Sequence, residues 1–153
     1  AESGPQRSAL WGLRESIPEA ERRDGGSVKH DISVQISRIP EFVEEAGRVL
    51  HATAPHRLSV FGHVGDGNLH YNVLPPMGET LEAFKEGPAE QISDALHELA
   101  VSLGGSFSAE HGVGVLKRDE LQKYGSPAAV GLMRTLKDAL DPNGIMNPGK
   151  VLG

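Results

Sequence analysis

The sequence predicts an α+β domain in which a small antiparallel sheet carries helices on one face. Segments with alternating apolar and polar residues, typical of half-buried strands, are separated by segments whose apolar residues recur at helical spacing. In addition, Asp66-Gly67 lies between two alternating segments, and this dipeptide favours a tight antiparallel hairpin. At 153 residues and 38% hydrophobic content, the chain is long enough for one domain with a modest core.

The expected elements follow the order strand, helix, strand, strand, helix, strand. We expect strands at 28–37, 58–64, 69–74 and 106–109, and helices at 40–51 and 89–103. Pro75-Pro76 ends the hairpin, because proline cannot continue a strand ladder, and Gly104-Gly105 is a typical end for the second helix. This order predicts the ferredoxin-like βαββαβ arrangement, with both helices on one face of the sheet.

Additional segments flank this unit on both sides. Residues 1–27 are expected to form an N-terminal extension or linker, with a short helical pattern that Pro18 interrupts. The domain itself is expected to span 28–153. In its C-terminal tail, the sequence pattern predicts a further helix that begins at Ser126-Pro127 and continues to Leu140, followed by turns.

Composition excludes several classes of protein. The net charge is −6 and there is no basic run, which argues against nucleic acid as a partner. No apolar run approaches the ~20 residues of a membrane span, and the N-terminal residues lack the apolar stretch of a signal peptide. The absence of cysteine excludes thiolate metal ligands and fits a reducing compartment, so we expect a cytoplasmic location.

The central hairpin is expected to bring two histidines together. If Asp66 and Gly67 are the two turn residues, His63 lies opposite His70 on one face of the sheet. Opposed Cβ atoms are roughly 4.5–5.5 Å apart, close enough for both rings to bind one metal ion. A turn shifted by one residue would separate the pair, and two such histidines can also be ordinary surface residues. The other face is expected to be apolar and to join the core, with Val60, Val64, Leu69, Tyr71 and Val73.

Three motifs resemble one protein family. They are Gly-His-Val-Gly-Asp-Gly-Asn-Leu-His-Tyr-Asn at 62–72, Glu-His-Gly-Val-Gly at 110–114 and Asp-Pro-Asn-Gly-Ile-Met-Asn-Pro-Gly-Lys at 141–150. The chain resembles, over nearly its whole length, the C-terminal domain of FAD-linked D-2-hydroxyacid dehydrogenases and oxidases. This group, within the vanillyl-alcohol-oxidase superfamily, acts on D-lactate, D-2-hydroxyglutarate or glycolate. The resemblance implies oxidation of a D-2-hydroxy acid to the 2-oxo acid with FAD as the hydride acceptor.

The resemblance also implies a metal centre beside a general base. His63, His70 and Glu110 would bind a divalent ion, usually zinc in the family, that the substrate hydroxyl and carboxylate chelate. Manganese and ferrous iron suit the same ligands. Three protein ligands with one open position are typical of catalytic zinc sites. His111 matches the residue that acts as the base, and the near-neutral pKa of imidazole suits that role.

Further residues match substrate or flavin contacts of the family. The resemblance implies that Arg14 and Lys29 bind the substrate carboxylate, that Asn72 lies at the flavin or substrate edge, and that Asn147 returns to the flavin. Pro18 stands where the family often has a threonine or similar hydroxyl. Because proline cannot donate a hydrogen bond, the substrate preference set at this position is open.

The chain does not account for the binding of FAD. No Gly-x-Gly-x-x-Gly motif follows an expected strand, and in the family a separate N-terminal domain binds most of the FAD. We therefore expect a C-terminal fragment or separately made domain that is inactive by itself. Its expected partners are the FAD-binding domain, a small 2-hydroxy acid and an electron acceptor, either a protein or a quinone; a homodimer stays open.

Two other classes of function are compatible with the residues. A stand-alone metallohydrolase would hold a zinc-bound water on His63, His70 and Glu110, with His111 as the base. A non-enzymatic binding or assembly module is a common use of ferredoxin-like domains. Hydrolysis of esters or phosphates without flavin would favour the first class. Partner binding and an activity of the parent protein that both survive His63→Ala and His70→Ala would favour the second.

Overall fold

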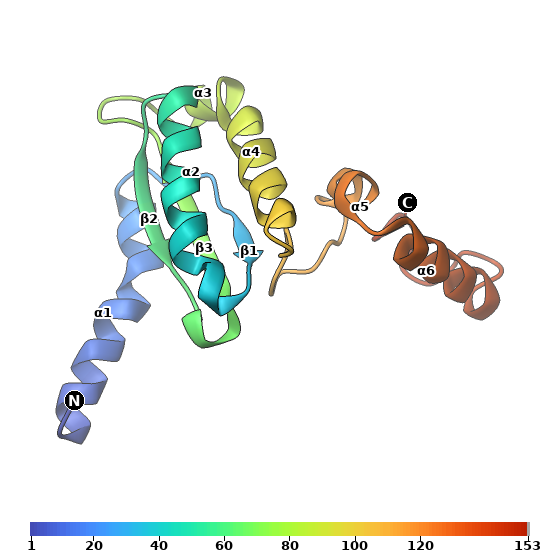
Figure 1. Cartoon of the computed structure of the whole chain (residues 1–153), viewed down its shortest axis with the longest axis horizontal. Helices are drawn as coiled ribbons and strands as arrows, with labels where there is room; N and C mark the ends of the chain where they lie inside the picture. Colours follow the sequence, from blue (N-terminus) through green and yellow to red (C-terminus); the bar gives the residue numbers. More distant parts are fainter. Residues whose placement is uncertain (153) are drawn as a thin grey trace.

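The computed structural model describes residues 1–152 and has the expected α+β class (Figure 1). The strands β1 (Asp31–Ser33), β2 (Arg57–Phe61) and β3 (Asn68–Leu74) form one antiparallel sheet in the order β1-β3-β2. The helices α2 (Ile39–Thr53) and α4 (Ala89–Ser102) confirm the two expected helices and lie on the same face of the sheet. A short helix, α3 (Leu81–Glu86), precedes α4.

The main core lies between the sheet and the two long helices. Alternate residues of the strands face it, which leaves the intervening residues of β1 and β3 on the opposite face of the sheet. Helical spacing brings the apolar residues of α2 and α4 to the same layer. The buried cluster consists of Ile32, Val34, Phe42, Ala46, Leu50, Leu69, Tyr71, Val73, Phe84, Ile92, Leu96 and Ala100.

The first and fourth strands are shorter than expected. The first strand covers only Asp31–Ser33, because the chain turns into the 3₁₀ helix η1 (Ile36–Arg38) soon afterwards. The fourth strand is reduced to one bridge, in which Ser106 and Ser33 exchange backbone hydrogen bonds of 2.8 and 3.0 Å. The bridge still places this segment beside β1, at the sheet edge opposite β2.

The predicted register of the hairpin is wrong. Phe61, and not His63, lies opposite His70, and a 3₁₀ turn, η2 (Val64–Asp66), replaces the two-residue turn. Gly67 packs on Val34, whose N–H donates to the Gly67 carbonyl at 3.0 Å. This contact draws the turn towards the segment after β1, so the connection is longer than a two-residue loop.

Two residues that were expected in the core are exposed. Val64 belongs to the turn and is 53% exposed, while Val60 on the edge strand β2 is 37% exposed. The other three, Leu69, Tyr71 and Val73, are buried on β3 as expected.

The N-terminal helix is longer than expected. α1 (Gly4–Arg23) is one 20-residue helix that continues through Pro18, so the predicted interruption is wrong. Contacts with the sheet hold it on both sides of the proline: the Arg14 guanidinium lies over the ring of Phe61, and Glu21 accepts hydrogen bonds from Asn72. The first part of α1 projects away from the sheet (Figure 1).

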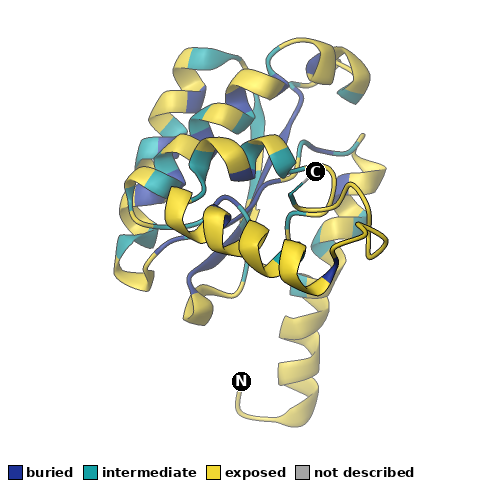
Figure 2. Ribbon diagram, turned by 90° about the vertical axis from the view of Figure 1, so that its right-hand side faces the viewer, coloured by how far each residue is buried: buried dark blue, intermediate teal, exposed yellow. Residues whose placement is uncertain are grey.

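The C-terminal tail forms a second, smaller core. α5 (Arg118–Tyr124) and α6 (Pro127–Leu140) pack around Phe107, Leu121 and Val130. α6 has the predicted bounds, yet most of its surface is exposed (Figure 2). Among the helices that the structure describes, none combines the length and apolar character needed to cross a membrane.

Candidate metal and substrate site

The three expected metal ligands lie together on the sheet face opposite α2 and α4. His70 lies on β3, His63 precedes η2, and Glu110 follows the reduced fourth strand. His63 Nδ1 is 2.9 Å from Glu110 Oε1, and His70 Nε2 is 3.5 Å from Glu110 Oε2. One ligand atom from each residue lies within 4.8 Å of the others. The loop before η2, rather than a cross-strand pair, brings His63 to this position.

This spacing fits one small cation. Zinc bonds to nitrogen and oxygen are about 2.0–2.2 Å long, so two ligand atoms of one tetrahedral ion lie roughly 3.4 Å apart. The 3.5 Å between His70 and Glu110 is close to that value, whereas the 2.9 Å between His63 and Glu110 is a hydrogen-bond distance that would lengthen around an ion. Two imidazoles and one carboxylate suit zinc, and they also suit manganese or ferrous iron. The residues therefore fit a divalent ion that keeps an open position for a ligand.

Burial adjusts the protonation of His70 in the direction that metal binding requires. Desolvation lowers the pKa of His70 below its ordinary value, and the nearby charges of Asp31 and Glu110 oppose this effect only in part. The neutral ring is the form that binds a metal ion. His70 is thus held in the ligand-competent state.

His111 lies directly beside this cluster. Its ring stacks on that of His70, with centroids 5.8 Å apart and an interplanar angle of 28°. The His111 side chain is 56% exposed, so its nitrogens are accessible to a molecule bound next to His70. This position suits a group that exchanges a proton with a bound molecule.

Asp31, which the sequence analysis does not single out, lies beneath the cluster. Its carboxylate accepts the backbone N–H groups of Glu110 and His111 at 2.7 and 2.8 Å, and the side-chain amide of Asn68 at 2.7 Å. Burial by itself raises the pKa of Asp31. The hydrogen bonds together lower this pKa by more than burial raises it, so the pKa lies below its ordinary value. The signal in the sequence is a carboxylate in the middle of an expected strand.

A cavity of about 350 Å³ opens beside His70. Both residues that were expected to bind a carboxylate, Arg14 and Lys29, line it. The Arg14 guanidinium carbon is 4.5 Å from the ring centre of Phe61, a cation–π contact that holds the cation at the cavity. The residues that line the cavity come from α1, the segment around β1, the hairpin and the 110–111 segment: Arg14, Pro18, Lys29, His30, Phe61, His70, Asn72, Glu110 and His111.

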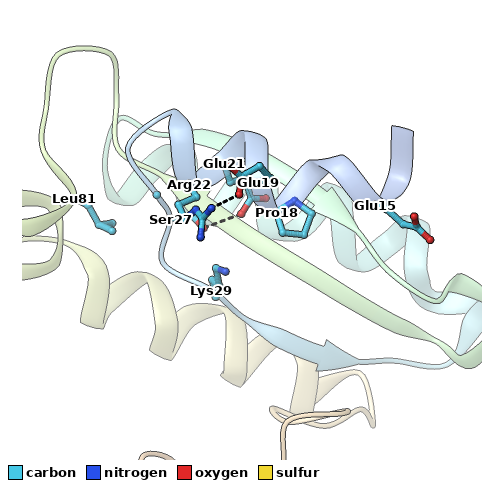
Figure 3. Close-up of a pocket in the computed structure, with 9 residues that line it drawn as sticks. Glu15, Pro18, Glu19, Glu21, Arg22, Ser27, Lys29 and Leu81 are labelled. Carbon is cyan, nitrogen blue, oxygen red and sulfur yellow. Dashed lines mark hydrogen bonds and ion pairs between the residues drawn. The ribbon is translucent and has the colours of Figure 1, made fainter. Parts of the chain in front are cut away.

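A second cavity adjoins the first beneath α1, and Pro18 and Lys29 line both (Figure 3). Here Glu21 is buried and accepts two hydrogen bonds, of 3.0 and 2.9 Å, from the amide nitrogen of Asn72. Ser27 donates a third at 3.0 Å. The cluster fixes the side chain of Asn72 and fastens α1 to the sheet.

Asn147 does not join the other expected site residues. It lies after α6 and lines a separate cavity within the tail, together with Lys137, Gly144 and other residues of 146–152. Its backbone has a φ of 47°, a left-handed conformation that asparagine tolerates better than most residues. The expected contact of Asn147 with the flavin stays a prediction.

Comparison with known proteins identifies the family. Residues 1–151 match the family model "FAD linked oxidases, C-terminal domain". The chain belongs to this family. Membership in the FAD-linked oxidase C-terminal domain family confirms the resemblance that the three sequence motifs carry.

Curated relatives of this FAD-linked oxidase C-terminal domain are named D-2-hydroxyglutarate dehydrogenase. The protein of Stutzerimonas stutzeri is 40% identical over 152 residues, which are 99% of this chain and 32% of the relative. The mitochondrial protein of Bos taurus is 43% identical over 143 residues, 94% of this chain and 25% of the relative. The chain thus spans between a quarter and a third of the length of these relatives.

Proposed function

We propose that the chain is the substrate- and metal-binding domain of an FAD-dependent dehydrogenase that oxidises a D-2-hydroxy acid to the 2-oxo acid. The observation that carries this proposal is the cluster of His63, His70 and Glu110 beside a cavity lined by two cations. The names of the relatives make D-2-hydroxyglutarate the first substrate to test.

The chemistry of a 2-hydroxy acid matches this arrangement. Its hydroxyl and carboxylate stand on adjacent carbons, so both can reach one cation while the carboxylate also meets positive side chains. Arg14 and Lys29 supply that charge, and the planar guanidinium of Arg14 can bind a carboxylate through two parallel hydrogen bonds. These contacts would set which face of the C2 carbon is presented.

We assign the hydroxyl proton to His111. When bound, a divalent cation lowers the pKa of a coordinated hydroxyl, and FAD serves as the acceptor of the C2 hydride. His111 lies beside His70 with an exposed ring, so it can accept the proton from a molecule in the cavity. Loss of the proton to His111 and of the hydride from C2 leaves the 2-oxo acid.

The FAD itself is proposed to bind mainly to a domain outside these 153 residues. Support comes from the family description and from the relatives, which are far longer than this chain. An electron-acceptor protein or quinone would reoxidise the flavin. A cytoplasmic location stays a prediction, since the bovine relative is named mitochondrial.

Metal content tests the proposed ligands. After exposure to zinc or manganese and removal of free metal, the wild-type chain is expected to retain stoichiometric metal by elemental analysis. The His63→Ala, His70→Ala variant is expected to lose it, because one carboxylate alone cannot hold the ion. His51→Ala is the matched control, since His51 is exposed on α2, on the other side of the sheet.

The results separate the proposed function from its alternatives. A wild-type chain without metal, or a double variant that keeps it, would contradict the ligand assignment. In the flavoenzyme that contains this domain, the double variant should lose oxidation of D-2-hydroxy acids and keep its flavin absorbance. Hydrolysis of esters or phosphates by the chain alone would favour a metallohydrolase instead.

A further inference from the structure

One buried carboxylate holds the segment that carries Glu110 and His111. Asp31 is 1% exposed, and its Oδ2 accepts the backbone N–H groups of Ala109, Glu110 and His111 at 3.2, 2.7 and 2.8 Å. Successive N–H groups directed at one oxygen form an anion-binding nest. These bonds replace the strand ladder beyond Ala109, so the chain curls over Asp31 and presents Glu110 towards His70.

The other oxygen of Asp31 is linked to the loop that carries His63. Oδ1 accepts the side-chain amide of Asn68 at 2.7 Å, and the amide oxygen of Asn68 accepts the backbone N–H of His63 at 3.4 Å. Asn68 is only 3% exposed. The Asp31–Asn68 pair therefore connects the backbone of His63 to that of Glu110.

The ring of His70 stands between two carboxylates. Its Nδ1 is 3.8 Å from Asp31 Oδ1, while its Nε2 is 3.5 Å from Glu110 Oε2. A histidine that binds a metal generally directs its other ring N–H at a carboxylate or carbonyl, which fixes the tautomer. Asp31 lies on the side of the ring that this role requires, and roughly 0.8 Å of ring movement closes the gap to a hydrogen bond.

We propose that Asp31, supported by Asn68, is the positioning residue of the site. It holds the backbone of Glu110 and His111, and it keeps the proton of His70 on Nδ1 so that Nε2 can bind a metal ion. The metal-binding part of this role rests on the proposed function, whereas the backbone and tautomer parts concern the metal-free chain.

The same contacts argue against Asp31 as a ligand. Ligand atoms of Asp31, His70 and His111 also lie within 4.8 Å of one another, so this set is a geometric alternative to the first. However, both oxygens of Asp31 already accept hydrogen bonds, one from the buried Asn68 amide and the other from the backbone N–H groups of Glu110 and His111. A metal ion on Asp31 would compete with these donors for the same two oxygens and would weaken the hydrogen bonds that hold the 110–111 segment.

The test compares Asp31→Asn with Asp138→Asn, which makes the same charge change at an exposed position of α6. Zinc affinity is measured by calorimetry, and the protonated nitrogen of His70 is identified by long-range proton–nitrogen NMR in the metal-free protein. Asp31→Asn is expected to weaken zinc binding by roughly 10- to 100-fold and to lose the preference for the Nδ1 proton. Asp138→Asn is expected to behave like the wild type.

Amide exchange in the wild type gives an independent readout. The amides of Ala109, Glu110 and His111 are expected to exchange slowly, because Asp31 holds them. If Asp31→Asn does not fold, the wild-type chain alone decides. The proposal is overturned if NMR finds the proton of wild-type His70 on Nε2, or if the amides of residues 109–111 exchange fast. A folded Asp31→Asn variant with unchanged zinc affinity and tautomer overturns it as well.

Failure of the proposed function gives a different result. A wild-type chain that binds no zinc contradicts the metal site. The tautomer of His70 and the amide exchange of the metal-free chain then still decide the role of Asp31.

Discussion

His30 and Asp31 are neighbours on the chain, yet their side chains have different partners. Asp31 organises the backbone of the 109–111 segment, whereas His30 bonds towards the helix layer. The ring nitrogens of His30 lie 2.9 Å from the Tyr71 carbonyl and 2.9 Å from the Ser93 hydroxyl. Both buried side chains thus have hydrogen-bond partners, as buried polar groups require.

The lowered pKa of His30 predicts how the free energy of unfolding changes with pH. Burial lowers it from 6.5 to about 4, so the folded chain binds fewer protons than the unfolded chain between these pH values. The free energy of unfolding should therefore fall as the pH drops through this window, by about 3 kcal/mol from this residue alone. Urea unfolding at pH 7, 6, 5 and 4 measures the effect, because the change is complete only near the lower pKa.

His30→Gln isolates this contribution. The variant should be less stable at pH 7 but should show a weaker loss of stability on acidification than the wild type. The pKa of His97 is also lowered, mainly by burial, and this effect remains in both proteins. The same pH dependence in wild type and variant would contradict the assignment to His30.

The hairpin shows how one turn differs from its sequence signal. The dipeptide Asp66-Gly67 predicts a turn with a positive φ, and Gly67 indeed has a φ of 74°. The length of the connection depends instead on the contact between Gly67 and Val34. That contact joins the turn to the segment after β1, and it is absent from the local pattern of the hairpin.

Gly67→Ala is expected to destabilise the chain by about 2 kcal/mol or more. The φ of 74° is unfavourable for alanine, and the added Cβ would lie 2.1 Å from the carbonyl oxygen of Val34. Gly65→Ala is the matched control, because Gly65 lies in the same turn with open space around it and no positive φ. Equal unfolding midpoints of the two variants in urea would contradict this account.

The whole chain combines a well-packed sheet unit with two exposed extensions. One large core lies under α2 and α4, and a small one lies within the tail. Most of α1 is exposed (Figure 2). It adds little apolar burial, since Leu10, Trp11 and Leu13 are all more than half exposed. The expected boundary between residues 1–27 and 28–153 stays a prediction, although Glu21 fastens α1 to the sheet.

Trp11→Ala is expected to change the free energy of unfolding by less than about 0.5 kcal/mol. Trp11 is 54% exposed, so its removal leaves no buried cavity. Phe42→Ala is the contrasting variant, because Phe42 is fully buried on α2 and its truncation costs about 3–5 kcal/mol. Urea unfolding followed by circular dichroism measures both; a loss of several kcal/mol for Trp11→Ala would contradict the exposed position of α1.

Local patterns in the sequence were sufficient for the α+β class, the positions of α2, α4 and α6, and the family. Helical spacing, strand alternation and turn residues involve neighbours in the chain, so they can be recognised without the fold. His63, His70, Glu110 and His111 could be selected because the motifs contain them. Arg14 and Lys29 also line the cavity, but only the resemblance singles them out, whereas strand alternation places Asn72 on the same face as His70.

Contacts between distant segments decided the rest. The hairpin register depends on Gly67 meeting Val34, and the reduced fourth strand depends on the N–H groups of 109–111 meeting Asp31. Neither contact leaves a periodic signal, because each joins residues that lie far apart in the chain. The role of Asp31 could not be predicted for the same reason. A lone carboxylate in a strand has no evident role until the fold surrounds it with hydrogen-bond donors from distant segments.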